Sequence, residues 1–218
     1  MPSHIGMSVL QMPGRDHRYN EPFEKDLRGM AKKIALTIYE YEGRGKQFFF
    51  FGHSLGALIA FEVARVLETH EGYAPTALFL SARRAAHITS PVKYHTWSDE
   101  ELLLMLREMA GTNQEFFEND ALRSIFLPII RSDFRLLESY SHNEDEKIDV
   151  DIVAMAGRAD VLAPPEEVKE WRKNTGGIFT YKEYEGDHFF INNNKEKILK
   201  NIGETIGFYI NNNRVLCC

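Results

Sequence analysis

Ser54 stands between two glycines in Gly52-His53-Ser54-Leu55-Gly56, a spacing typical of a strand, a sharp turn and a helix that together expose a nucleophile. The segment 47–51, apolar from residue 48 onward, is too short to span a membrane and predicts a buried strand, and residues 57–65 carry an apolar helical pattern. In such a nucleophile elbow the serine hydroxyl points out of the sheet at the helix N-terminus. Both glycines are expected to be necessary, because the turn is strained and the helix packs close to the strand. The pattern predicts nucleophilic catalysis by Ser54, with an ordinary serine turn as the alternative.

A serine hydroxyl is a weak nucleophile at neutral pH, so the elbow requires a histidine base and an acid that orients it, in the chain order Ser, Asp or Glu, His. His188 directly follows an expected strand at 178–185, and Asp160 follows an expected strand at 150–156. Open α/β sheets place their catalytic groups at the carboxyl ends of such strands. Asp160 and His188 are therefore the predicted acid and base.

Two other residues compete for these roles. Asp133, in Arg131-Ser132-Asp133-Phe134, is an alternative acid, but its surroundings read as helical. His142 follows the elbow as well, but it lies in the polar stretch 141–146 and is expected to be solvated. Neither occupies a strand end, so both are ranked below Asp160 and His188.

Strands alternate with helices over most of the chain, which predicts an α/β fold with a mostly parallel sheet and helices on both faces. The expected strands cover residues 7–12, 47–51, 76–81, 150–156 and 178–185, and the expected helices cover 24–41, the elbow helix to about 67, 165–171 and 195–209.

A long insertion, residues 83–147, interrupts the alternation. Ser98 and Glu101 form a capping box that opens a helix, and a second helical run covers 120–140 with a kink expected at Pro128. An insertion rich in Leu, Met, Phe and Ile at the rim of a parallel sheet is either a lid over an apolar pocket or plain helix packing. The sequence leaves both interpretations open.

The composition fits one domain over residues 1–218, with 44% hydrophobic residues. A net charge of −6 argues against nucleic-acid binding, and no apolar run approaches the length of a membrane span. Metal-binding and Walker motifs are not found, and Gly43-Arg44-Gly45 lacks the third glycine of a dinucleotide fingerprint, so no cofactor and no metal are expected. Cys217 and Cys218 are the two cysteines, which predicts a reducing, cytoplasmic setting; the pair is either a lipid attachment site or a frayed tail.

Four motifs together resemble the type II thioesterases of polyketide and non-ribosomal peptide synthesis and the similar medium-chain thioesterase that acts with fatty acid synthase. Residues 11–15, with Arg18 and Glu21-Pro22, are similar to the family's Q-L-P-G-R segment and its continuation. Residues 50–57 are similar to its F-F-G-H-S-M-G-A elbow. Residues 131–134 are similar to R-A-D-F, and residues 186–190 to G-G-H-F-F.

The resemblance implies an α/β-hydrolase fold and hydrolysis of acyl chains from the phosphopantetheine thiol of an acyl or peptidyl carrier protein. It implies Ser54 as the nucleophile, His188 as the base and Asp160 as the acid, with the Leu55 N–H as an oxyanion-hole donor. A monomer is expected. The elbow alone fits a general carboxylesterase or lipase equally well, and a non-catalytic remnant that binds acyl chains or a carrier protein is the third interpretation.

The chain departs from the family pattern in three places. Asp187 replaces a glycine beside the base, and Leu55 replaces a methionine of which only the backbone N–H is used. The family carries a glycine-rich strand and a P-x-A-G-G-S loop before the strand expected at 7–12, and the sequence as given starts at Met1 without it. We expect that segment to supply a central strand and the second oxyanion donor.

Overall fold

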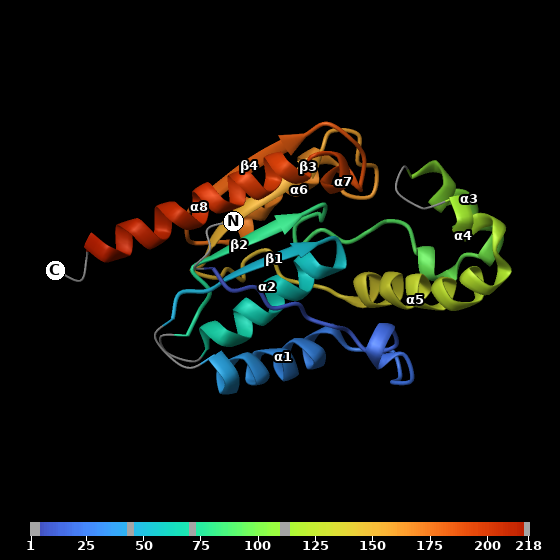
Figure 1. Cartoon of the computed structure of the whole chain (residues 1–218), viewed down its shortest axis with the longest axis horizontal. Helices are drawn as coiled ribbons and strands as arrows, with labels where there is room; N and C mark the ends of the chain where they lie inside the picture. Colours follow the sequence, from blue (N-terminus) through green and yellow to red (C-terminus); the bar gives the residue numbers. More distant parts are fainter. Residues whose placement is uncertain (1–4, 43–45, 70–72, 110–113, 216–218) are drawn as a thin grey trace.

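The centre of the molecule is a four-stranded sheet in which every neighbouring pair of strands is parallel (Figure 1). A computed structural model describes residues 5–42, 46–69, 73–109 and 114–215. The strands β1 (Phe49–His53), β2 (Ala77–Ser81), β3 (Asp151–Gly157) and β4 (Phe179–Tyr184) lie in the order β1-β2-β3-β4. Because the strands are parallel, their carboxyl ends meet at one edge of the sheet.

Helices cover both faces of this sheet, as expected for an α/β fold (Figure 1). Alternate residues of β2 point to opposite faces: Leu78 and Leu80 belong to the core formed with α1 (Leu27–Glu42) and α2 (Leu55–Glu68). Phe79 belongs to the second core, which is formed with α8 (Lys195–Val215). Both faces of β2 are therefore buried, which explains its continuous apolar sequence.

Short helices complete the connections at the carboxyl edge. The chain passes from β3 to β4 through α6 (Pro165–Lys169) and the 3-10 helix η3 (Glu170–Asn174), where the sequence had predicted one helix over 165–171. The four-residue helix α7 (Phe190–Asn193) follows β4 and directly precedes α8. Two further 3-10 helices are η1 (Asp16–Arg18) and η2 (Tyr94–Thr96).

The segment between β2 and β3 forms a separate group of helices beyond the carboxyl ends of the strands (Figure 1). These helices are α3 (Asp99–Glu108), α4 (Gln114–Glu118) and α5 (Asp120–Ser139). The predicted capping box is confirmed, because Glu101 N–H donates to Ser98 Oγ at 3.2 Å and Ser98 N–H donates to Glu101 Oε2 at 2.7 Å. The group has its own apolar cluster, and Phe189, next to His188, packs against it.

The strand predicted for Met7 to Met12 is wrong. The structure assigns no secondary structure to residues 5–12, and the Met7 and Val9 side chains are 80% and 79% exposed. A strand requires a hydrogen-bonded neighbour, and among the described residues β1 pairs with β2 alone. Met12 alone among the apolar residues 7–12 packs against the core formed with α1 and α2.

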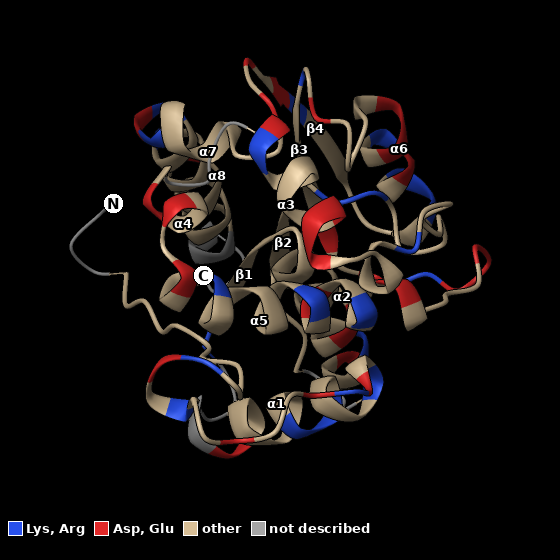
Figure 2. Cartoon of the chain, turned by 90° about the vertical axis from the view of Figure 1, so that its right-hand side faces the viewer, with Lys and Arg blue, Asp and Glu red and all other residues tan. Residues whose placement is uncertain are grey.

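Basic and acidic residues alternate over the side of the molecule that carries α3, α4 and α5 (Figure 2). That view shows no continuous basic stripe over the described residues. No helix in the part of the chain that the structure describes is long and apolar enough to cross a membrane. The cysteine pair at 217–218 and the glycines at 43 and 45 lie outside the described residues.

Candidate active site

Ser54 occupies the turn between β1 and α2 with φ 53° and ψ −116°, a backbone conformation that L-residues rarely adopt. Its backbone N–H donates to the carbonyl of Ser81 at the end of β2, at 2.8 Å. This bond ties the strained turn to the neighbouring strand. The predicted strand, turn and helix of the elbow are thus confirmed as local structure.

The two glycines of the elbow differ in what surrounds them. A Cβ at Gly52 would stand 2.2 Å from the carbonyl oxygen of Gly56 and 2.5 Å from the Ala57 nitrogen, so α2 packs too close to β1 for any side chain. A Cβ at Gly56 would meet no atom within 4 Å. The sequence argument that packing requires both glycines therefore holds for Gly52 and is wrong for Gly56.

We expect Gly52→Ala to lower the free energy of unfolding by about 3 kcal/mol or more, because backbone atoms of the elbow must move apart. Gly56→Ala should unfold at the same temperature as the wild type or slightly higher, since alanine is the better helix former. Thermal unfolding followed by circular dichroism measures the melting temperatures of the two variants and the wild type. Equal melting temperatures for the two variants would contradict the close packing at Gly52.

His188 and Asp160 extend a row of hydrogen bonds from the Ser54 hydroxyl. His188 Nε2 lies 3.0 Å from Ser54 Oγ, and His188 Nδ1 lies 2.9 Å from Asp160 Oδ2. The other carboxylate oxygen, Asp160 Oδ1, accepts the backbone N–H groups of Leu162 and Ala163 at 2.9 and 3.0 Å. His188 and Asp160 are 6% and 2% exposed, so the row is largely shielded from water. The structure brings together the three residues that the sequence singled out.

The loops that carry Asp160 and His188 are fixed to each other through the backbone. The Ala159 N–H donates to the Gly186 carbonyl at 2.9 Å. A Cβ on Gly157, the last residue of β3, would stand 2.3 Å from the Asp187 carbonyl oxygen, so the two loops touch directly. Asp187, which replaces the family's glycine, accepts the Phe189 N–H at 2.9 Å and thereby supports the turn that holds His188.

The competing acid, Asp133, lies elsewhere. Its two carboxylate oxygens accept both terminal nitrogens of Arg15, at 2.7 and 2.9 Å. This pair joins α5 to the N-terminal segment and links one residue of the motif 11–15 to one residue of the motif 131–134. Asp133 is therefore a structural ion-pair partner in this fold.

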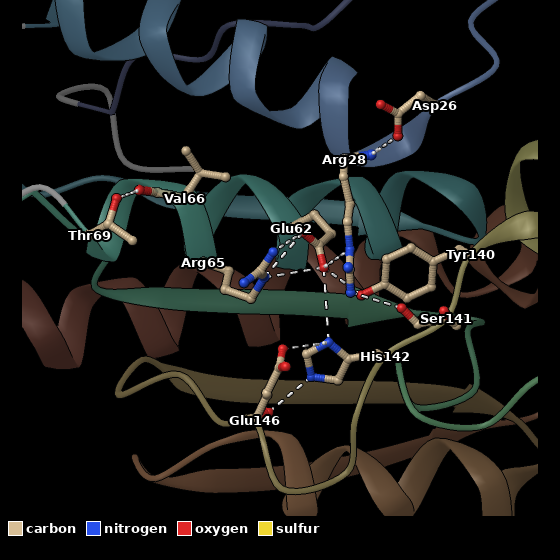
Figure 3. A network of polar contacts seen from close by, with 10 residues as sticks. All are labelled: Asp26, Arg28, Glu62, Arg65, Val66, Thr69, Tyr140, Ser141, His142 and Glu146. Carbon is tan, nitrogen blue, oxygen red and sulfur yellow. Dashed lines mark hydrogen bonds and ion pairs between the residues drawn. The ribbon is translucent and has the colours of Figure 1, made fainter.

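The prediction that His142 is solvated is wrong, because its side chain is 0% exposed. Figure 3 shows its ring between the side chains of Glu62 and Glu146. The His142 ring packs edge-on against Phe61, and its Nδ1 lies 4.0 Å from the buried carboxylate of Glu62 on α2. Its Nε2 lies 2.9 Å from the Glu146 carbonyl oxygen within the same polar stretch, but the polar sequence gave no sign of the burial, since Phe61 and Glu62 come from a distant part of the chain. His142 takes no part in the row of Ser54, His188 and Asp160.

His53, the residue before the candidate nucleophile, is held neutral by its environment. Its Nδ1 lies 3.0 Å from Ser81 Oγ, and burial, with a smaller contribution from the nearby His188, lowers the pKa of His53 to about 4. In the unfolded chain an ordinary histidine binds a proton near pH 6.5. Between about pH 6.5 and 4 the unfolded state therefore binds more protons here, and stability falls as the pH falls.

We expect His53→Asn to reduce the loss of stability between pH 7 and pH 4.5 by up to about 3 kcal/mol relative to the wild type. Urea unfolding at pH 7 and pH 4.5 gives the change in unfolding free energy for each protein. Subtracting the change in the variant from the change in the wild type removes the contributions of other groups that titrate in the same range. Parallel stability curves for the two proteins would show that His53 is protonated in the folded state.

A cavity of about 30 Å³ opens beside the row, with room for one or two water-sized groups. Its wall includes Ser54, Arg83, Tyr94, Phe134, Glu138 and His188. The sequence analysis missed Arg83 and Glu138. The sequence could have pointed to Glu138, because it follows Phe134 by four residues, and this spacing places a carboxylate on the same face of α5 as an apolar side chain. No group of His, Cys, Asp and Glu residues suited to hold a metal occurs within the described ranges.

Leu55 is the first residue of α2, where a backbone N–H has no carbonyl four residues earlier in the helix. Its N–H is therefore free of the helical ladder and lies next to Ser54. The oxyanion role of Leu55 and the second donor expected from a preceding segment stay predictions.

The parallel sheet and the row of Ser, His and Asp side chains at its carboxyl edge are the arrangement of an α/β-hydrolase. The model of the thioesterase domain family matches residues 1–206, and the chain belongs to this family. The fold and the family expected from the sequence motifs are confirmed.

Several known proteins are similar to this chain over most of its length. Linear gramicidin dehydrogenase LgrE of Brevibacillus parabrevis is 36% identical over 214 residues, covering 96% of this chain and 81% of the relative. Thioesterase PikA5 of Streptomyces venezuelae is 36% identical over 203 residues, covering 93% of this chain and 72% of the relative. The structure of the type II thioesterase BorB, from the borrelidin biosynthetic cluster, superimposes with a TM-score of 0.78 at 34% identity, covering 89% of this chain and 78% of BorB.

Proposed function

We propose that this chain hydrolyses acyl chains from the phosphopantetheine thiol of an acyl or peptidyl carrier protein. The observation that carries the proposal is the hydrogen-bonded row from Ser54 through His188 to Asp160. The row alone fits any serine hydrolase. Family membership and the likeness to thioesterases such as PikA5 and BorB support the thioester and the carrier protein.

In the proposed mechanism Ser54 Oγ attacks the thioester carbonyl carbon while His188 Nε2 takes the hydroxyl proton. Asp160, hydrogen-bonded to Nδ1, holds the imidazole in place and stabilises its charged form. The Leu55 N–H donates to the oxyanion of the tetrahedral intermediate. The carbon–sulfur bond then breaks, and the pantetheine thiolate receives the proton from His188. Water attacks the acyl-serine with His188 again as base, releasing a carboxylic acid and free Ser54.

Residues 83–147 act in this proposal as the lid of a single domain over residues 1–218. Helices α3, α4 and α5 lie beyond the carboxyl ends of the strands, and α5 supplies Phe134 and Glu138 to the wall of the small cavity. An acyl chain longer than a few atoms exceeds a cavity of about 30 Å³, so the lid moves when such a chain binds. We further propose that the protein acts as a monomer in the cytoplasm and needs no metal or cofactor.

The name of LgrE includes the word dehydrogenase, which would imply a different chemistry. The present sequence has no dinucleotide fingerprint, since Gly43-Arg44-Gly45 lacks the third glycine. Hydrolysis is therefore the reaction that its residues support. A carboxylesterase, which would use the same elbow on oxyesters, is the remaining rival.

We expect kcat/KM to be at least tenfold higher for an acyl group on a carrier protein than for the same acyl group on coenzyme A or as a matched oxyester. Docking of the carrier protein adds binding energy far from the reacting carbon, and this energy appears in kcat/KM. Initial rates with one acyl chain on all three carriers provide the test. Equal values for carrier protein and coenzyme A would remove the docking claim, and a preference for the oxyester would favour the carboxylesterase.

A further inference from the structure

Helix α5 brings a buried carboxylate to the cavity beside Ser54 and His188. Glu138 lines this cavity with a side chain that is 2% exposed. Its Oε2 is paired with the Nδ1 of His95 and lies 3.4 Å from the His95 backbone nitrogen. Its Oε1 is buried and has no hydrogen-bond partner among the described residues. A buried carboxylate oxygen without a partner costs free energy, so a group that donates a hydrogen bond is expected next to it.

The same cavity wall contains a hydrogen-bond donor without a partner. Arg83, which follows β2, is 8% exposed, and its Nε is buried with no acceptor within the described part of the chain. Burial lowers the pKa of Arg83 to about 10, which leaves the guanidinium charged at neutral pH. The adjacent Arg84 is already engaged, since it donates to the Leu162 carbonyl at 2.7 Å and lies 3.1 Å from Glu167. Arg83 Nε is thus a buried donor without an acceptor among the described residues.

We propose that Glu138 is a specificity-determining residue, and that the preferred acyl chain carries a hydroxyl group that donates to Glu138 Oε1 and accepts from Arg83 Nε. This inference rests on the thioesterase function proposed above. It adds to that function a class of substrate, short hydroxyacyl thioesters, and the two side chains that select them.

The choice of a hydroxyl follows from the chemistry of the two atoms. A hydroxyl both donates and accepts, whereas an ammonium group donates to Glu138 but accepts nothing from Arg83. A carboxylate on the acyl chain would meet the like charge of Glu138, and a hydrocarbon chain would leave both atoms unpaired. The cavity of about 30 Å³ also suits a group as small as a hydroxyl. A site built to hydrogen-bond a substrate hydroxyl discriminates strongly against an analogue that lacks it.

The test compares butyryl-pantetheine with its 2-hydroxy, 3-hydroxy and 3-amino derivatives, using the full chain. We expect one of the two hydroxyacyl thioesters to exceed butyryl in kcat/KM by about tenfold to a hundredfold. Glu138→Met, which is close in size and removes the acceptor, should lower that ratio to about one. Asp133→Asn is the matched control, because Asp133 lies on the same helix outside the cavity wall, and it should keep the wild-type ratio.

Glu138→Gln is a second variant that controls for misfolding, because glutamine retains the shape of the side chain and one carbonyl acceptor. This variant should melt like the wild type, and its ratio of kcat/KM for the hydroxyacyl thioester to kcat/KM for butyryl should be intermediate. Equal hydrolysis of butyryl and both hydroxyacyl thioesters by the wild type would mean that the cavity holds water only and would overturn the proposal. A hydroxyl preference that survives in Glu138→Met would overturn the role of Glu138, and a preference for the amino derivative would overturn the assignment of a hydroxyl.

Fluorophosphonate labelling of Ser54 separates this inference from the proposed function, because labelling requires an activated serine and no contact with Glu138. A labelled protein without hydroxyl selectivity overturns the inference alone. A protein that neither reacts with the label nor hydrolyses any thioester overturns the proposed function and the inference with it.

Discussion

Ser54→Ala and His188→Ala should each lower kcat for thioester hydrolysis by about 10⁴-fold or more. Members of a catalytic triad act as one unit, so the loss of either the nucleophile or the base removes nearly the whole contribution of the row. Ser54 Oγ and His188 Nε2 are 3.0 Å apart, within reach for the proton transfer. Turnover measured by thiol release, with circular dichroism to confirm folding, provides the test. Near-normal rates in either variant would contradict the proposed mechanism.

Asp160→Asn should lose far more activity than Asp133→Asn. The Asp160 carboxylate binds His188 Nδ1, and an amide there would no longer stabilise the charged imidazole. Asp133 binds Arg15, so its replacement removes an ion pair away from the candidate site. Both are aspartates changed to the isosteric amide, which makes them a matched pair. The reverse order of activities would show that the acid has been assigned to the wrong residue.

The sequence predicted the sheet well because its strands are defined by local patterns. Strand β2, expected at 76–81 and found at Ala77–Ser81, is apolar from residue 77 to residue 80 because helices cover both of its faces. Strand β4, expected at 178–185 and found at Phe179–Tyr184, is followed by the turn that carries His188. Asp160 and His188 could be selected because residues just beyond parallel strands share one edge of the sheet, whatever their separation in the chain.

Features that depend on distant partners could not be predicted in this way. Residues 7–12 have an apolar pattern but no neighbouring strand, so the expected strand is not found. Glu138 becomes part of the cavity only because α5 packs over the carboxyl edge of the sheet. Glu62 stands in the elbow helix as one carboxylate among apolar residues, and its partner Tyr140 is 78 positions further along the chain. Composition and periodicity carry no information about such pairs.

Glu62 is the centre of a buried polar network that joins the elbow helix to the end of α5 (Figure 3). Its side chain is 0% exposed and accepts the Tyr140 hydroxyl at 2.5 Å and Arg65 Nε at 3.2 Å. Arg28 Nε and His142 Nδ1 lie 3.9 and 4.0 Å from Glu62 Oε1. Burial, together with the neighbouring Glu62 carboxylate, raises the pKa of Tyr140, so its hydroxyl remains a donor at physiological pH.

Glu62→Ala should lower the free energy of unfolding by about 3 to 5 kcal/mol, because it leaves the Tyr140 hydroxyl without its acceptor and removes the anion that faces two arginines. For a chain of this length the melting temperature should fall by about 10 °C. Tyr140→Phe removes one hydrogen bond but keeps the contact between Glu62 and Arg65, so its effect should be smaller, about 1 to 2 kcal/mol. Thermal and urea unfolding measure both variants.

Glu204→Ala, at an exposed position of α8, is the control for loss of a carboxylate and should leave the melting temperature unchanged.

The buried network around Glu62 predicts a further effect, on substrate binding at the candidate site. Glu62 lies eight residues after Ser54 on the helix that follows the elbow, and Tyr140 directly follows α5, which lines the cavity. If the network fixes α5 against the elbow helix, Tyr140→Phe should raise KM for short acyl thioesters by more than it lowers kcat. A Glu62→Ala protein that melts with the wild type would show that solvent or other side chains replace the carboxylate, and that the network does not hold α5 in place.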